Sequence, residues 1–311
     1  MQSQMPTRVG VISLVVLMVG IGPAPILAAP GYEGVPTLGP GHGPYISILC
    51  YQDISEDADA PTSSVSASTL RRQIRYLRDQ GFEFATVSQL ASYRSRHYML
   101  PSKVAVLTFD GGYESFYDDV LPILREEDVG ATLSIITSLV DSSPADGPAR
   151  LSWEQIREIA ASGFVEIASQ THALHTLNPE YPEGENMSAV TTRLYDTEMD
   201  RYEDNAAYRV RLRDDFGRSR ELLTEHAGVE VRVLSWPFGE HNQVAREIAR
   251  LEGLPVTLGL EGGWVTRHQL RQGYLPRNLV TRETPIEAQG MTWFSPSLEP
   301  VQTAGAVTSD L

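Results

Sequence analysis

The chain has 311 residues and a formal net charge of −15. That length suits one barrel-sized domain or two smaller ones, and an acidic chain repels nucleic acid and anionic lipid, so we expect no nucleic-acid partner. The only cysteine is Cys50, which excludes an internal disulfide. The apolar run around Cys50 predicts a buried, inert thiol.

The N-terminus has the order of a secretory signal. Arg8 precedes an apolar run over residues 9–21, and two alanines close the segment. The run is short for a membrane span and is interrupted by Gly and Pro. We therefore expect a cleaved signal peptide over residues 1–29, with an uncleaved anchor as the alternative, and a flexible leader over residues 30–44. The mature protein is expected to be periplasmic or secreted, without a stable membrane span.

Alternating strand and helix patterns follow in chain order. The predicted strands cover residues 45–51, 82–87, 104–109, 131–137, 164–169, 231–236, 256–260 and 275–280. The predicted helices cover residues 68–80, 88–93, 114–124, 153–161, 208–227 and 241–251. This alternation predicts one α/β domain over residues 45–295 with a mainly parallel sheet, open or closed into a barrel. Residues 177–207 read as a long polar surface loop, and residues 296–311 as a disordered tail.

The central predicted strand carries the first candidate for chemistry. The apolar run over residues 104–109 indicates a strand buried on both faces. It stops at Asp110, and Gly111 and Gly112 then turn the chain before a helical pattern begins near Glu114. Parallel α/β folds place catalytic groups at the carboxyl ends of their strands. A solvated aspartate at a strand end is the alternative.

Four short segments fall at predicted strand ends. They are residues 51–53, 109–112, 169–175 and 236–240. In a parallel α/β fold all four would gather at the same rim, and this convergence favours a site more than any one segment does.

These segments carry a family resemblance. In order they read ILCYQDI, LTFDGGY, EIASQTHALH and SWPFGEHN, followed by LGLEGGW and LPRNLV. The chain resembles the NodB-type polysaccharide deacetylases, most closely the N-terminal domain of periplasmic poly-β-1,6-N-acetylglucosamine N-deacetylases. The resemblance implies a single-domain, distorted (β/α) barrel. It also implies a divalent metal (zinc, cobalt or nickel) held by one Asp and two His, a second Asp as base and a His as acid. The implied substrate is an N-acetylated amino-sugar polymer.

The family pattern is only partly present. Asp110 matches the base and His175 matches the second metal histidine, whereas Gly111 stands at the metal aspartate, Gln170 at the first metal histidine and Gln52 at the acid. A catalytic divalent metal normally needs about three protein ligands. Glutamine has no proton to give at neutral pH, so Gln52 cannot serve as the acid.

One rebuilt metal site remains open. His172 lies three positions before His175, and Asp110 could change from base to ligand. A set of Asp110, His172 and His175 is therefore conceivable, with His172 as a solvated loop residue in the alternative reading.

The residues Trp236, Pro237 and Phe238 match the family pattern of the turn at this strand end. The resemblance implies that a backbone N–H of this turn donates to the developing oxyanion. Trp236 is also a candidate for stacking on a sugar face, with core packing as its alternative. Arg277 could orient Asp110 or a substrate, or form an ordinary surface ion pair.

Two functions therefore remain open. The first is a secreted protein that recognises a polymer of the poly-N-acetylglucosamine type, or a partner in exopolysaccharide export, with deacetylation weak or lost and no metal. The second is an active metal-dependent N-deacetylase with the rebuilt site. A structural or regulatory domain without a binding groove is a third possibility, against which the intact turn argues.

Overall fold

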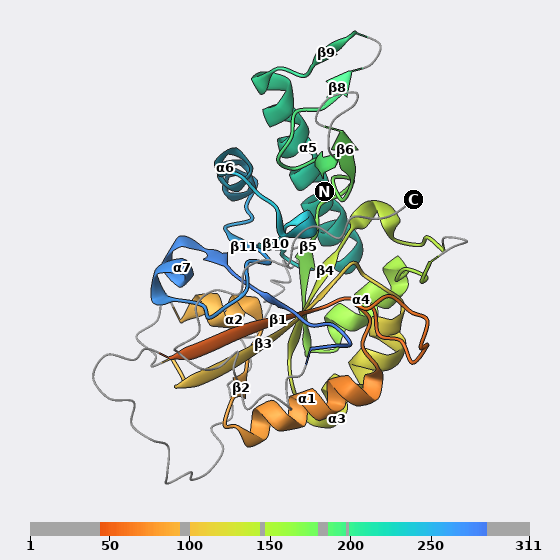
Figure 1. The fold of residues 1–311 in the computed structure, drawn as a ribbon, viewed down its shortest axis with the longest axis vertical. Coiled ribbons are helices and arrows are strands. Elements are labelled where there is room, and N and C mark those ends of the chain that lie inside the picture. Colours follow the sequence, from red (N-terminus) through yellow and green to blue (C-terminus); the bar gives the residue numbers. More distant parts are fainter. Residues whose placement is uncertain (1–43, 94–99, 144–146, 180–185, 197–198, 285–311) are drawn as a thin grey trace, which may run out of the picture. The chain divides into compact units, whose positions relative to one another are not determined.

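A computed structural model describes residues 44–93, 100–143, 147–179, 186–196 and 199–284 (Figure 1). All of them belong to the compact unit His42–Leu311. The expected signal peptide, nearly all of the leader and the expected tail lie outside the described residues, and those assignments stay predictions. No helix in the described ranges is long and apolar enough to cross a membrane.

The described residues form one main sheet of nine strands in which every pairing is parallel. The strand order is β12-β11-β10-β5-β4-β3-β1-β13, and β2 pairs with β3. The strands are β1 (Tyr45–Tyr51), β2 (Glu83–Phe84), β3 (Lys103–Asp110), β4 (Ala131–Ile135), β5 (Val165–Ser169), β10 (Val233–Ser235), β11 (Val256–Leu258), β12 (Tyr274–Leu275) and β13 (Asn278–Leu279). This confirms the predicted parallel α/β architecture.

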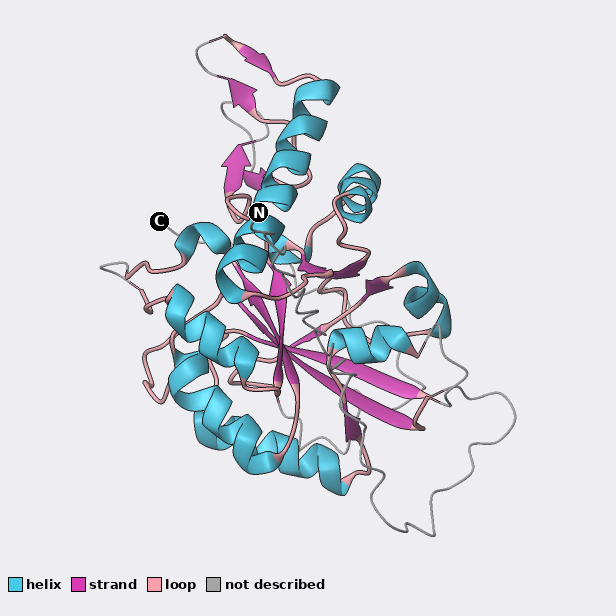
Figure 2. Cartoon of the chain, turned by 180° about the vertical axis from the view of Figure 1, so that it is seen from behind, coloured by secondary structure: helices cyan, strands magenta, loops and turns pink. Residues whose placement is uncertain are grey.

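The sheet curls toward closure. Its two edge strands, β12 and β13, follow each other in the chain with only Pro276 and Arg277 between them. Since the three steps from Leu275 to Asn278 span at most about 11 Å, the opposite edges of the sheet must lie close together. Figure 2 shows the strands fanning out from a common centre. The sheet is thus an incomplete barrel, as the predicted distorted (β/α) barrel requires, and Arg277 lies where its edges meet.

Helices cover both faces of this sheet. They are α1 (Ala67–Asp79), α2 (Val87–Ser92), α3 (Leu121–Glu127), α4 (Trp153–Ala161), α5 (Asn205–Ala227), α6 (Gln243–Leu251) and α7 (Arg267–Gln272). Helical single turns occur at Phe116–Val120, Thr137–Leu139 and Pro237–Gly239. The α4 helix begins at a capping box, in which the Ser152 side chain accepts from the Gln155 amide and the Gln155 side chain accepts from the Ser152 amide.

The two faces of β3 explain its continuous apolar run. Leu107 and Phe109 join a core cluster with residues of α1, α3, α4 and α5, and Val106 joins a second cluster with residues of α2 and α7. Alternate residues of a strand point to opposite faces. Thr108 and Asp110 therefore share the face of Val106, so the terminal carboxylate of β3 points to the side away from the larger helical layer.

The prediction of one long surface loop over residues 177–207 is wrong in detail. It contains two short antiparallel hairpins, β6 (Leu177–Pro179) with β7 (Asn186–Ser188) and β8 (Tyr195–Asp196) with β9 (Arg201–Tyr202). Strands of two or three residues are too short to carry an alternating pattern. Tertiary contacts support them instead: Arg211 on α5 donates to the Ala189 carbonyl oxygen at 2.8 Å and pairs with Glu203.

The last predicted strand, residues 275–280, is also wrong as a single element. It divides into β12 and β13, which lie at opposite edges of the sheet, because Pro276 and Arg277 carry the chain from one edge to the other. Helix α7 was not expected from the sequence.

Candidate active site at the carboxyl rim of the sheet

Three side chains from separate strand ends meet at the carboxyl rim. Asp110 ends β3, Gln170 follows β5 directly, and Arg277 lies between β12 and β13. Parallel strands end at the same edge, so residues far apart in the chain become neighbours there. Of the four strand-end segments, the structure joins those of Asp110 and Gln170 by a hydrogen bond. Gln52 follows β1 at the same edge.

The centre of the site is a buried ion pair. Arg277 Nη1 lies 2.7 Å from Asp110 Oδ1, and Nη2 lies 2.8 Å from Oδ2. Arg277 is 0% exposed and Asp110 6%. Arg277 also donates to the Gly259 carbonyl oxygen at 3.1 Å and to Thr108 Oγ1 at 3.2 Å. Burial alone would lower the pKa of Arg277, but the Asp110 charge raises it. This is no surface ion pair: Arg277 holds both oxygens of Asp110.

Gln170 contacts the same carboxylate. Its Nε2 donates to Asp110 Oδ2 at 3.1 Å. An ionised carboxylate only accepts, so the amide nitrogen must face Asp110 and the amide oxygen must face away. That oxygen, Gln170 Oε1, is buried and has no hydrogen-bond partner among the described residues. The next residue, Thr171, has φ +70, a strained value for a β-branched residue, which fixes the turn that follows β5.

His175 lies against Phe238. Their ring centroids are 4.4 Å apart, and Phe238 is 39% exposed with a backbone φ of +58. Burial lowers the pKa of His175, the Asp110 charge opposes this shift, and Arg150 adds to it. His175 is therefore neutral at neutral pH, with an exposed aromatic ring beside it.

His172 has a different neighbourhood. Its Nδ1 lies 3.0 Å from Thr137 Oγ1, and its backbone N–H donates to Asp215 Oδ1 at 2.8 Å. The Ala173 N–H donates to the other oxygen of Asp215 at 2.7 Å. Burial raises the pKa of Asp215, and these two backbone hydrogen bonds partly offset the shift. Asp215 on α5 thus anchors the loop after β5, a role that nothing in the sequence pattern indicated.

The donor set does not fit a divalent metal. Among the described residues, no group of three or more His, Cys, Asp or Glu side chains gathers closely enough to hold a metal ion, so Asp110, His172 and His175 do not form such a group. Gly111 offers no ligand, and Gln170 is engaged with Asp110. A catalytic site for zinc normally has about three protein ligands, which this rim does not supply.

The backbone and the neighbours of position 111 disfavour a larger residue. Gly111 has φ +99, outside the range that other L residues adopt readily. A Cβ there would lie 2.8 Å from Arg150 Nη1 and 2.7 Å from Tyr113 Cε2. An aspartate at position 111 would therefore require the Arg150 and Tyr113 side chains to move.

The turn after β10 does not present Trp236 as a stacking surface. Trp236 is 0% exposed, with its ring packed near Phe216 and His241 at centroid distances of 5.9 and 5.7 Å. Its ring is not available to a sugar face. Pro237 is buried as well, whereas Phe238 presents its ring to solvent. Phe238 is thus the solvent-exposed aromatic side chain of this turn.

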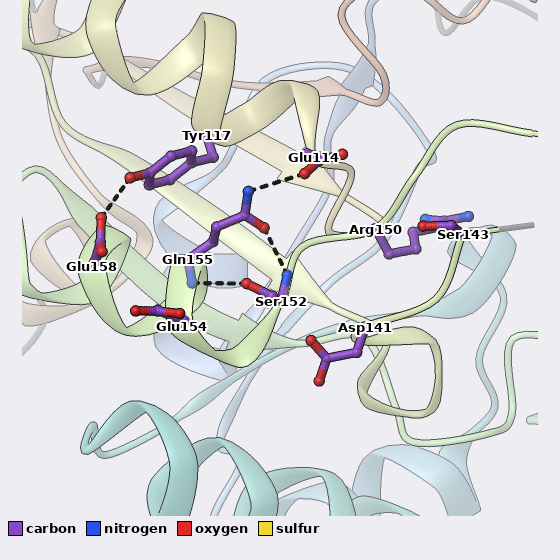
Figure 3. A pocket seen from close by; sticks show the side chains of 9 residues that line it. All are labelled: Glu114, Tyr117, Asp141, Ser143, Arg150, Ser152, Glu154, Gln155 and Glu158. Carbon is purple, nitrogen blue, oxygen red and sulfur yellow. Dashed lines mark hydrogen bonds between the residues drawn. The ribbon is translucent and has the colours of Figure 1, made fainter.

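A hollow of about 460 Å³ lies beside Arg150 (Figure 3). Its lining is mostly polar and comprises Glu114, Tyr117, Asp141, Ser143, Arg150, Ser152, Glu154, Gln155 and Glu158. Tyr117 donates to Glu158 Oε2 at 2.5 Å, and Gln155 Nε2 donates to Glu114 Oε1 at 3.1 Å. Arg150 connects this hollow to the rim, because its Nη1 donates to the Gly111 carbonyl oxygen at 2.6 Å. Of the residues that line the hollow, sequence reasoning placed Glu114 near the rim and singled out none of the others.

The parallel barrel and the strand-end segments are those of the polysaccharide deacetylase family. The family model for polysaccharide deacetylase matches residues 97–257, and the chain belongs to that family. It is 33% identical over 257 residues to the poly-β-1,6-N-acetyl-D-glucosamine N-deacetylase of Escherichia coli K12. That match covers 79% of this chain but only 38% of the relative, so the chain spans about two-fifths of the relative's length.

Two solved structures share the fold closely. A de-N-acetylase from Aggregatibacter actinomycetemcomitans superimposes with a TM-score of 0.70 at 28% identity, covering 77% of this chain and 96% of that one. The BpsB deacetylase domain from Bordetella bronchiseptica gives a TM-score of 0.67 at 29% identity, covering 77% and 97%. These similarities confirm the predicted NodB-type barrel as a single deacetylase domain.

Proposed function

We propose that this protein binds an N-acetylated amino-sugar polymer of the poly-N-acetylglucosamine type and that its deacetylation is weak or lost. The proposal depends mainly on the hydrogen bonds that the carboxylate of Asp110 receives. Arg277 and Gln170 hold its two oxygens at 2.7 to 3.1 Å, and Gln170 occupies the position at which the family resemblance places a metal histidine.

The expected loss of activity follows from the chemistry of amide hydrolysis. The reaction needs stabilisation of a developing oxyanion and a proton for the leaving amine. Gln52 has no proton to give at neutral pH, and the described residues hold no metal-binding group. Removing such stabilisation costs several kcal/mol of transition-state energy, or several orders of magnitude in rate.

Retained recognition is supported by what the rim still offers. Phe238 presents an exposed ring next to His175, which suits stacking on the apolar face of a sugar. Position 52 still carries a partly exposed polar side chain, Gln52, that can bind hydroxyl or acetamide groups. The relatives with the same fold are named as deacetylases of poly-β-1,6-N-acetylglucosamine or as de-N-acetylases.

Location and partners belong to the same proposal. The signal-like residues 1–29 support export to the periplasm or beyond, where an exopolysaccharide is available. A component of the export machinery is a fitting protein partner. Because the E. coli relative is much longer than the match, the activity of that whole protein is not carried over.

The test is binding of β-1,6-linked N-acetylglucosamine oligomers to the purified protein by calorimetry in EDTA. We expect binding without metal, weaker binding of fully deacetylated oligomers, and a loss of affinity in Phe238→Ala. The control is Leu251→Ala, which removes another exposed apolar side chain. Absence of binding contradicts the proposal. Binding that requires zinc, cobalt or nickel supports instead an active N-deacetylase with a rebuilt Asp110, His172 and His175 site.

A further inference from the structure

Arg150 is held firmly beside the end of β3. Its backbone forms an antiparallel bridge with Tyr113, and the neighbouring Leu151 N–H donates to the Gly112 carbonyl oxygen at 2.9 Å. Two segments that are distant in sequence are therefore paired in a fixed register. This pairing determines where the Arg150 side chain begins.

The guanidinium group is fixed as well. Its Cζ lies 3.9 Å from the centroid of the Tyr113 ring, and Nη1 donates to the Gly111 carbonyl oxygen at 2.6 Å. The same Nη1 is 2.8 Å from the place where a Cβ of residue 111 would stand. A positive charge thus occupies the space into which a metal-binding aspartate at position 111 would project.

The guanidinium of Arg150 has N–H groups that are available to a ligand. Within the described part of the chain, Arg150 forms no ion pair with a carboxylate, and its hydrogen bond to Gly111 uses one of five guanidinium N–H groups. Arg150 is half-buried and lines the hollow of about 460 Å³ shown in Figure 3. The remaining N–H groups can receive an oxygen atom that enters the hollow.

The lining of the hollow discriminates between oxygen ligands. Besides Arg150 it carries four carboxylates, Glu114, Asp141, Glu154 and Glu158. Their charges repel an anion such as acetate, whereas a neutral carbonyl oxygen meets no such repulsion. The acetamide of an N-acetylated sugar has a neutral carbonyl oxygen of this kind.

We propose that Arg150 takes the place that the divalent metal holds in the family: its guanidinium is the fixed cation that receives the carbonyl oxygen of an N-acetyl group, and it must move before residue 111 can carry a metal ligand. The first half rests on the proposed glycan binding. The second half does not, since it concerns only residues 111, 113 and 150.

Oligomer binding in EDTA tests the first half. We expect Arg150→Met to bind β-1,6-linked N-acetylglucosamine oligomers about tenfold more weakly than the parent, because a hydrogen bond from a charged donor contributes about that much. Arg150→Lys should lie between the two. Arg218→Met, which removes an exposed arginine of α5, should match the parent. Acetate should not compete. Equal affinity in Arg150→Met, or displacement of the oligomer by acetate, overturns this half.

Zinc binding tests the second half without any glycan. The variant with Gln52→His, Gly111→Asp and Gln170→His should bind zinc about tenfold more weakly than the same variant with Arg150→Met added, because a guanidinium close to the site repels the metal. Melting curves give a metal-free readout: Gly111→Asp should lower Tm less in the Arg150→Met background than in the parent. Equal zinc affinity with equal Tm losses overturns the claim. If the parent binds no oligomer, the proposed function fails and this experiment alone decides the role of Arg150.

Discussion

The buried pair of Asp110 and Arg277 gives the sharpest stability prediction. Arg277→Met removes two charge-assisted hydrogen bonds to Asp110 and those to Gly259 and Thr108, while leaving Asp110 buried. Removing one partner of a buried pair typically costs about 3 to 5 kcal/mol, because the remaining charge has lost its compensation. We expect a loss of that size in the free energy of unfolding, measured by urea denaturation followed by tryptophan fluorescence.

A matched control separates burial from charge. Arg71 pairs with Glu126 at 2.9 Å, but these side chains are 33% and 50% exposed. Arg71→Met should therefore cost less than about 1 kcal/mol. The double variant Asp110→Asn/Arg277→Met should cost at least about 1 kcal/mol less than the sum of the single changes, because the two residues interact directly. A cost for Arg277→Met no larger than that of Arg71→Met would refute the reasoning.

Three further predictions concern stability and reactivity. Burial raises the pKa of Cys50 to about 12, so a thiol reagent should modify it only after unfolding, and rapid modification of native protein would contradict this. Burial alone would raise the pKa of Glu127, but hydrogen bonds from Arg78 and Arg75 lower it. This group therefore stabilises the fold above its unfolded pKa, and the contribution is lost as pH falls through the folded value. Glu127→Gln should cost about 1 to 2 kcal/mol in urea denaturation at neutral pH, with a gap that closes below about pH 4; a constant gap would refute the assignment. Trp236→Ala should cost about 3 to 5 kcal/mol by the same assay, and a loss below about 1 kcal/mol would show that its ring is not core.

The sheet could be predicted because a strand that is buried on both faces has a continuous run of apolar residues. The run before Asp110 is continuously apolar, since clusters on each side of β3 cover it. The rim followed from the parallel topology alone. The short hairpins between residues 177 and 203 could not be predicted, because strands of two or three residues depend on contacts with α5 rather than on their own pattern.

Charged residues and aromatic rings in the site were the hardest to place. An arginine in a sequence is an exposed residue by default. The structure alone shows that Arg277 is buried against Asp110 and that the half-buried Arg150 lies over the ring of Tyr113. Trp236 and Phe238 stand two residues apart in one turn, yet one is fully buried and the other 39% exposed. The positive φ of Phe238 directs this outcome, and no sequence pattern indicates it.

Acetate release tests the central claim most directly. The purified protein, its Asp110→Asn variant, and a variant with Gln52→His, Gly111→Asp, Gln170→His and Arg150→Met are each given β-1,6-linked N-acetylglucosamine oligomers with zinc, cobalt or nickel. The account predicts no release above background from the natural chain, no effect of Asp110→Asn, and metal-dependent release from the restored variant. Metal-dependent release from the natural chain that disappears in Asp110→Asn would contradict it.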